Sequence, residues 1–193
     1  MQKIFTTSEP PSSFALANAG LFPETPKKCQ LPGCQMPIQM KKHGFYARYI
    51  ISPEYSGYIY IRRYFCSICG RTLSYLPDFA IPYFQYAICH ILGFLDGFFK
   101  SGKSLRRYEF WFRKKNGDFS RRHFRYYINR LFRNKRLIQY FLNFSCQGMI
   151  PEEDALNSQM FAKEFLKKAL ILQPHNFSCR FHNMTGKSIL APN

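Results

Sequence analysis

The chain has 193 residues, of which 46% are hydrophobic and 18% are aromatic. This length and composition suit one domain of ordinary size or two small ones, and they argue against wholesale disorder. Lys and Arg number 28 against 11 Asp and Glu, so the formal net charge is +17. A charge of this sign disfavours basic substrates and favours a polyanionic partner, with nucleic acid ahead of an anionic membrane surface.

Residues 1–28 predict a flexible leader, because four prolines (Pro10, Pro11, Pro23 and Pro26) lie among several Ser and Thr residues. The apolar stretch within this segment is too short for the hydrophobic region of a secretory signal. We therefore expect a reducing compartment, in which closely spaced cysteines indicate a metal site rather than disulfides.

Residues 29–77 predict a small zinc ribbon. Its cysteines form two short pairs, Cys29-x4-Cys34 and Cys66-x2-Cys69. Two such pairs can supply four thiolates to one tetrahedral Zn²⁺, and metal binding contributes folding free energy that so small a unit lacks. The competing interpretation is two unrelated pairs of buried or free thiols.

The segment between and after the cysteine pairs predicts a hairpin followed by a short third strand. Residues 45–51 form the first expected strand, residues 58–65 the second and residues 71–74 the third. Alternation along the second strand gathers one set of side chains on a single face, namely Tyr58, Tyr60, Arg62 and Tyr64. A knuckle, a hairpin, a second knuckle and a strand together make the layout of a zinc ribbon.

The run from Arg62 to Ser74 resembles the second knuckle of the zinc ribbons that open many bacterial insertion-sequence transposases. Their pattern is a basic and aromatic strand, then C-x-x-C, then Gly-Arg-Thr-aromatic-Ser, and here Leu73 takes the aromatic position. The first knuckle departs from theirs as well, since C-x2-C is commoner than C-x4-C. Residues 76–83 are similar to a transposase-like family of Firmicutes. The resemblance extends over residues 29–135 and implies a DNA-targeting role.

Residues 78–144 predict a mostly helical region. We expect helices over residues 84–99 and 105–115, and a turn at 116–118 that leads into a third helix. The second helix has a short apolar face made by Leu105, Tyr108, Trp111 and Phe112. The longest apolar stretch, residues 81–99, contains polar and charged side chains, so it predicts a core helix and not a membrane span.

The third helix, with Ser120 as its N-cap, has two contrasting faces. Helical spacing predicts a core face of Phe124, Tyr127, Ile128, Leu131 and Phe132. The opposite face is predicted to bind nucleic acid through Arg122, Arg125, Tyr126, Asn129, Arg130 and Arg133. Arg and Asn are the side chains that read guanine and adenine edges in the major groove, and a helix, a turn and a capped basic helix match helix-turn-helix order.

The positive charge is concentrated around this helix. Lys100 to Arg136 contains fourteen Lys and Arg but only two acidic residues, Glu109 and Asp118. Further contacts to nucleic acid are therefore expected from Arg106, Arg107, Lys114 and Lys115. The competing interpretation is a solvated cationic face on an ordinary helix, although such faces normally mix charges of both signs.

Residues 145–193 predict a helix followed by a polar tail. His175, Cys179 and His182 could bind a metal together with Cys146, but a loosely ordered tail is the more economical interpretation. Three acidic residues at 152–154 point in different directions and suit a helix start better than a catalytic metal site. We therefore expect no enzymatic activity.

These predictions combine into an α+β protein with an N-terminal zinc ribbon and a helix-turn-helix region. We expect a sequence-specific protein that binds double-stranded DNA, related to the targeting or regulatory part of insertion-sequence transposases. Expected partners besides DNA are a transposase catalytic subunit or a second copy, with no membrane, in a bacterial cytoplasm near the nucleoid. The alternative is an RNA- or protein-binding zinc-ribbon module whose tyrosine face stacks bases.

Overall fold

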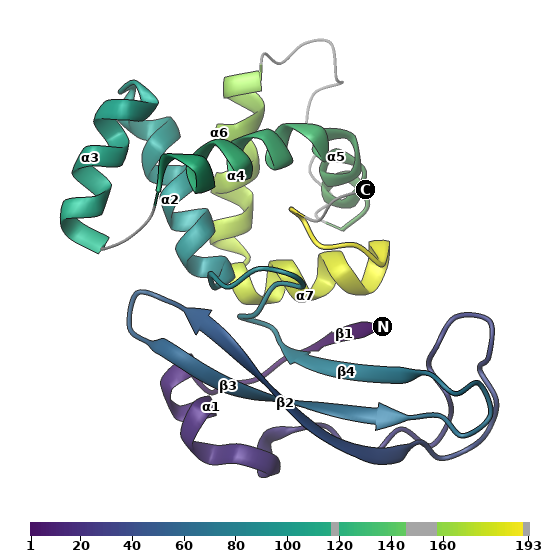
Figure 1. Cartoon of the computed structure of the whole chain (residues 1–193). Coiled ribbons are helices and arrows are strands. Elements are labelled where there is room, and N and C mark those ends of the chain that lie inside the picture. The colour runs from purple at the N-terminus through teal and green to yellow at the C-terminus, as the bar shows by residue number, and fades with distance from the viewer. Residues whose placement is uncertain (117–119, 146–157, 191–193) are drawn as a thin grey trace. The chain divides into compact units, whose positions relative to one another are not determined.

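The computed structural model describes residues 1–116, 120–145 and 158–190, and it divides the chain into two compact units. Met1–Ala87 contains the strands, and Ile88–Asn193 is helical where it is described (Figure 1). The change from one unit to the next comes later than the boundary expected after residue 77. None of the described helices combines the length and the hydropathy needed to cross a bilayer.

The first unit contains one four-stranded sheet with the order β1-β4-β3-β2. The central hairpin pairs β2 and β3 antiparallel, β4 pairs antiparallel with β3, and β1 pairs parallel with β4. The expected hairpin and third strand are present but longer than the sequence pattern indicated. The strand bounds are Gln2–Phe5 for β1, Lys41–Ile51 for β2, Ser56–Phe65 for β3 and Thr72–Pro77 for β4.

Residues 1–28 are not the flexible leader that we expected. The strand β1 occupies an edge of the sheet, and helix α1 (Pro11–Ala17) and a 3-10 turn (Asn18–Leu21) follow it. Phe14 of α1 is buried, with its ring 6.3 Å from Phe5, 5.5 Å from Phe22 and 5.5 Å from Phe79. The prolines suggested a loose segment, but the aromatic side chains between them bury enough apolar surface to hold it on the sheet.

The segment that follows β4 bonds to β2, which lies at the other edge of the sheet from β1. The backbone of Ile51 accepts a hydrogen bond from Ala87 and donates one to Gln85, each of 2.8 Å. The guanidinium of Arg48 donates to the carbonyls of Ile81 and Phe84. Because residues 85–87 bond to β2 in this way, helix α2 begins at Ile88 and not at residue 84 as expected.

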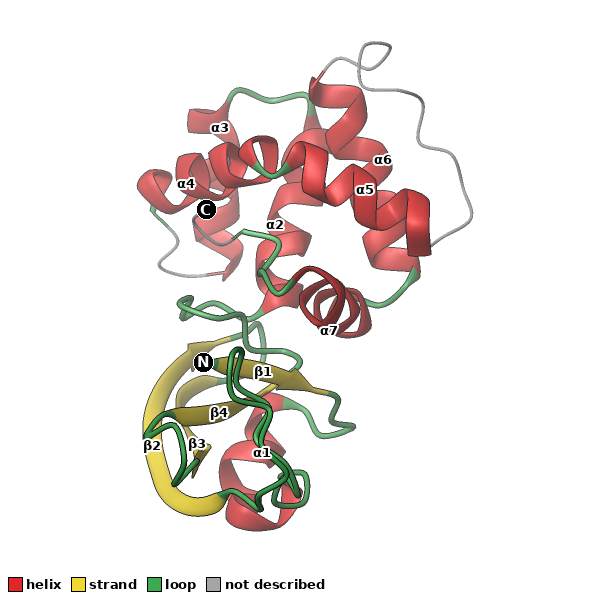
Figure 2. Cartoon of the chain, turned by 90° about the vertical axis from the view of Figure 1, so that its right-hand side faces the viewer, coloured by secondary structure: helices red, strands yellow, loops and turns green. Residues whose placement is uncertain are grey.

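The second unit is built from short helices, α2 to α7 in Figure 2. Buried phenylalanine side chains make up much of its core. Phe94 of α2 stacks on Phe124 of α4 with 3.8 Å between ring centroids, and Phe112 of α3 meets both rings. The bounds are Ile88–Ser101 for α2, Leu105–Asn116 for α3, Arg121–Arg133 for α4, Lys135–Ser145 for α5, Ser158–Ile171 for α6 and Pro174–Thr185 for α7.

Two details of the helical unit differ from expectation. The C-terminal part contains α6 and α7, whose Phe161, Phe165, Phe177 and Phe181 are fully buried, in place of one helix and a polar tail. In α3, Tyr108 and Phe112 are buried, whereas Trp111 is 47% exposed. Of the turn expected at 116–118, residue 116 is the last residue of α3. Residues 117 and 118, Cys146 and the acidic residues 152–154 lie outside the described residues.

Candidate metal centre and basic helix

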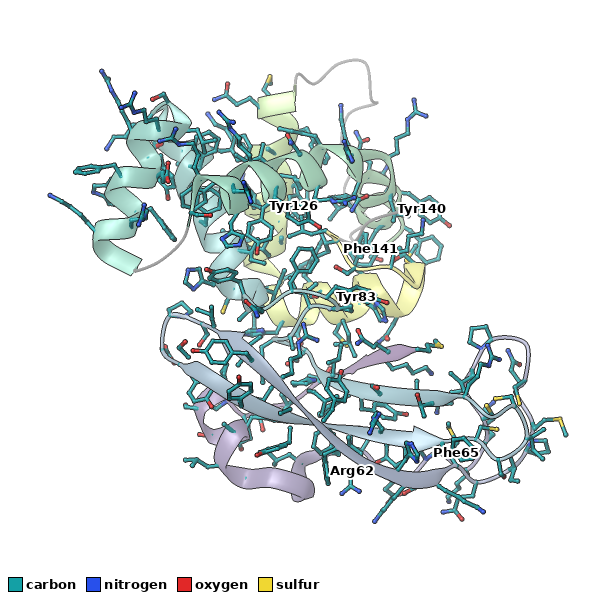
Figure 3. All side chains as sticks on the ribbon, in the orientation of Figure 1. Arg62, Phe65, Tyr83, Tyr126, Tyr140 and Phe141 are labelled. Carbon is teal, nitrogen blue, oxygen red and sulfur yellow. The ribbon has the colours of Figure 1, made fainter. Side chains whose placement is uncertain are left out.

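The structure brings the four predicted cysteines together at one end of the sheet. The sulfurs of Cys29, Cys34, Cys66 and Cys69 all lie within 4.8 Å of one another. Two of the distances are 4.0 Å, from Cys29 to Cys69, and 3.9 Å, from Cys34 to Cys66. Figure 3 shows sulfur atoms gathered beyond Phe65, where β3 ends. The cluster could hold a metal ion.

Each cysteine pair is presented by a tight turn closed by backbone hydrogen bonds. In the first turn, the amide of Cys34 donates to Leu31 at 3.2 Å, and that of Cys29 donates to Met36 at 2.9 Å. In the second turn, Gly70 donates to Cys66, and Cys66 donates to Arg71, both at 3.0 Å. Gly33 and Gly70 have φ angles of 78° and 66°, a left-handed conformation that costs glycine no steric strain.

Two long side chains connect these turns to each other and to the sheet. The guanidinium of Arg71 donates to the carbonyl of Pro32 at 2.6 Å, so it joins the second turn to the first. The hydroxyl of Tyr75 on β4 donates to the side-chain oxygen of Gln30 at 3.0 Å. Sequence reasoning did not assign either residue to the site, since neither Arg nor Tyr is a usual zinc ligand. The one feature of the sequence that could have indicated them is that both closely follow the second cysteine pair.

The environment acts differently on two of the thiols. Burial raises the pKa of Cys29 to about 12, although a backbone hydrogen bond from Leu31 opposes this. Burial by itself would raise the pKa of Cys69 as well, but hydrogen bonds from the backbone and side chain of Arg71 lower this pKa to about 6. Cys69 therefore ionises more readily than Cys29, and the thiolate is the form that binds metal.

The helix α4 has the two faces that the sequence predicted. Ser120 is its N-cap, and the hydroxyl accepts a 3.5 Å hydrogen bond from the amide of His123. The core face packs inward, with Phe124, Tyr127 and Leu131 buried and with Ile128 and Phe132 partly buried. The exposed side chains of the opposite face are Arg122, Arg125, Tyr126, Asn129 and Arg133.

One member of the basic face is less accessible than the others. Arg130 is partly buried, and its guanidinium lies 5.2 Å from the ring centroid of Tyr126 (labelled in Figure 3). On α3, Arg106, Arg107 and Lys114 are exposed, and Lys114 lies over Phe110. The side chain of Lys115 is outside the described part of the chain. The described cations thus come from two helices that are successive in the chain.

A buried carboxylate that sequence reasoning did not single out orients these two helices. Glu109 of α3 is 7% exposed and accepts a 2.9 Å hydrogen bond from the backbone amide of Arg121, the first residue of α4. It also forms a 2.6 Å ion pair with the Arg121 guanidinium. A negative charge at a helix N-terminus is favourable, so Glu109 stabilises α4 and fixes its start against α3.

The comparisons with known proteins concern only part of this arrangement. A family described as a domain of unknown function (DUF6431) matches residues 31–108. This segment contains three of the clustered cysteines and α2, and it ends before α4. No curated protein and no solved structure matches the chain. The similarity therefore gives no activity for the segment.

Proposed function

We propose that this chain binds double-stranded DNA in a sequence-specific manner, with α4 as the recognition helix and a zinc ribbon in the first unit. The observation that carries the proposal is the division of α4 into a buried aromatic face and an exposed face of Arg and Asn. A helix whose accessible side chains are mainly cations and amides suits the major groove, where they meet phosphates and base edges.

The geometry of the cysteine cluster supports Zn²⁺ as the metal. Four sulfurs bound at about 2.3 Å to one tetrahedral zinc lie about 3.8 Å apart. The sulfur–sulfur distances of 4.0 Å and 3.9 Å approach that value and are far longer than a disulfide bond of about 2.05 Å. Four cysteines without a carboxylate ligand also suit a structural zinc site better than a catalytic one.

The pairing of α3 and α4 supports a helix-turn-helix arrangement. Glu109 holds the start of α4, and Phe112 packs against Phe124 at 5.6 Å between ring centroids. In such motifs the first helix crosses the backbone while the second enters the groove. We assign phosphate contacts to Arg106, Arg107, Lys114 and Lys115, and base contacts to Arg122, Arg125, Asn129 and Arg130.

The resemblance of the second cysteine turn to insertion-sequence transposases supports a role in mobile-element DNA. In this role the chain would target or regulate an element and leave catalysis to a transposase subunit. Self-association would let two copies read the two halves of a symmetric site. The location that follows is the bacterial cytoplasm, on the nucleoid.

The proposal can be tested by selecting duplexes from a random DNA library with the full chain loaded with zinc. Enriched sequences are the expected result. The Arg125→Ala and Asn129→Ala variants should bind the enriched duplexes about 5- to 150-fold more weakly than the unmodified chain does. The reason is that one base contact contributes about 1–3 kcal/mol. The four assigned phosphate contacts should give log K a slope of about −4 against log salt.

Arg180→Ala on α7 is the matched control, since it removes the same charge from an exposed site on another helix. Its affinity for the selected duplex should change much less than that of the α4 variants. Selection without enrichment would refute sequence specificity. Equal affinities of Arg125→Ala, Asn129→Ala and the unmodified chain would refute the assignment of α4.

A further inference from the structure

One face of the β2–β3 hairpin carries a stripe of exposed aromatic side chains. Strand pairing sets Tyr49 beside Tyr58, Ala47 beside Tyr60 and Phe45 beside Arg62 on this face. Tyr58 is 61% exposed and Tyr60 is 49% exposed. Because Ala47 is small, the ring of Tyr60 has no bulky neighbour directly across the ladder.

The aromatic rings in this stripe are held in place by contacts within the hairpin. Tyr49 and Tyr58 meet edge to face at 5.1 Å, and the Tyr49 hydroxyl hydrogen-bonds to Ser56 at 2.9 Å. The guanidinium of Arg62 lies 4.0 Å from the centroid of Phe45. A planar guanidinium stacked on a ring is itself a surface on which a base can stack.

The stripe leads directly into a cationic hollow of about 370 Å³. Lys27, Lys42 and Arg62 line the hollow together with one carboxylate, Glu24. Tyr64, which we expected on the exposed tyrosine face, is 2% exposed and donates from its hydroxyl to the carbonyl of Pro23 at 2.9 Å. Tyr64 therefore forms a wall of the hollow and is not a stacking platform.

We propose that this surface, which we call the hairpin face (Phe45, Tyr58, Tyr60, Arg62 and the hollow), binds single-stranded nucleic acid. Three cations against one carboxylate suit phosphate, and exposed rings suit unpaired bases. Duplex DNA hides its base faces within the stack, so it cannot use Tyr58 and Tyr60 in this way. Aromatic platforms next to a cationic groove are the general means of binding single strands.

The hairpin face is independent of the proposed recognition helix. It lies in the first unit, whereas α4 lies in the second, and none of its residues takes part in the duplex contacts assigned above. The two proposals can therefore fail separately. A strand opened next to a bound duplex site is one source of the ligand, and an RNA is the other.

The test measures fluorescence anisotropy of labelled oligothymidylate and oligouridylate with the full zinc-loaded chain. Tyr60→Ala should weaken binding about 5- to 150-fold, because one base stack contributes about 1–3 kcal/mol. Tyr60→Phe should keep the affinity, since it keeps the ring. Lys42→Ala should lower the salt slope by about 0.7, the value for one phosphate contact on a single strand.

Tyr83→Ala is the control, because Tyr83 is 80% exposed but lies in the segment after β4 and not on the hairpin face. It should leave single-strand affinity unchanged, as should Arg180→Ala on α7. Tighter binding of one oligonucleotide identifies DNA or RNA as the source. Failure of the unmodified chain to bind either strand would overturn the proposal, as would a Tyr60→Ala variant that binds as tightly as Tyr60→Phe.

Discussion

The two units of this chain close their cores by different means. In one part of the first unit's core, Cys29 and Cys66 are buried in a cluster with Leu31, Tyr64 and Leu73, so thiols lie among apolar side chains there. In the second unit stacked phenylalanines such as Phe94 and Phe124 make the core. The first unit should therefore depend on a bound metal for its stability, and the second should not.

The polar interactions that stabilise the two units also differ. The first unit holds its cysteine turns with backbone hydrogen bonds and with Arg71, which reaches from one turn to the other. The second unit uses Glu109, a buried acid in its most basic stretch. Few side chains thus set the local geometry in each unit: the cysteines and Arg71 at the turns of the first, and Glu109 at the start of α4 in the second.

Loss of a bound metal should have the largest effect of all, and this effect should fall on the first unit and not on the second. Cys66→Ser or a strong chelator should expose the amides around both cysteine turns, because structural zinc can contribute about 10 kcal/mol or more to folding in small domains. The helices of the second unit should keep their protection. Hydrogen exchange read by mass spectrometry and metal stoichiometry on the full chain measure both effects.

Cys89→Ser is the matched control, since Cys89 lies on α2 and outside the cluster. It should leave the metal stoichiometry unchanged. A Cys66→Ser chain that still binds one metal with unchanged amide protection would contradict a metal-dependent first unit. Loss of protection throughout the second unit would instead show that its stability is coupled to the metal.

Loss of the buried carboxylate should have the next largest effect, confined to the second unit. Glu109→Gln should lower the free energy of unfolding by about 2–3 kcal/mol, because it removes the ion pair and weakens the bond to the α4 amide. Denaturation followed by fluorescence of the single tryptophan, Trp111 on α3, reports on this unit.

Asp96→Asn gives the comparison within the same unit. Asp96 pairs with Lys100 one helical turn away at 2.8 Å, and the lysine side chain is 69% exposed. Such a pair contributes only about 0.3–0.5 kcal/mol. Equal losses in the two variants would show that Glu109 does not fix the start of α4.

The smallest expected effect depends on pH and belongs to the first unit. Burial raises the pKa of Asp78 to about 6 from 3.8, although hydrogen bonds from the Thr7 and Phe79 amides oppose this. The folded carboxyl therefore keeps a proton that the unfolded chain has lost. Rising pH lowers stability from about pH 4 to about pH 6, and the full cost remains above that window.

Asp78→Asn removes this cost, so it should stabilise the first unit by about 1–2 kcal/mol near pH 7.5, with allowance for solvent screening. Near pH 3 the gain should vanish, because Asp78 is then largely protonated in both the folded and the unfolded chain. Hydrogen exchange of the strands at both pH values measures the difference. A gain that does not change with pH would contradict the raised pKa.

The sequence alone predicted the features that depend on local spacing. The β2–β3 hairpin and the two faces of α4 follow from fixed periods of two and 3.6 residues. Short spacing also fixes the cysteine turns, because Gly33 and Gly70 supply the left-handed conformations they need. These predictions needed no knowledge of what packs against each segment.

The tertiary structure decided which residues of each strand or helix are buried by other segments. The four residues of β1 are too few to show a period, and only pairing with β4 makes them a strand. Tyr64 and Tyr60 lie on one face of β3, yet Tyr64 is buried and Tyr60 is exposed. Burial depends on segments distant in the chain, such as residues 22–25, which lie beside Tyr64 but leave Tyr60 open to solvent.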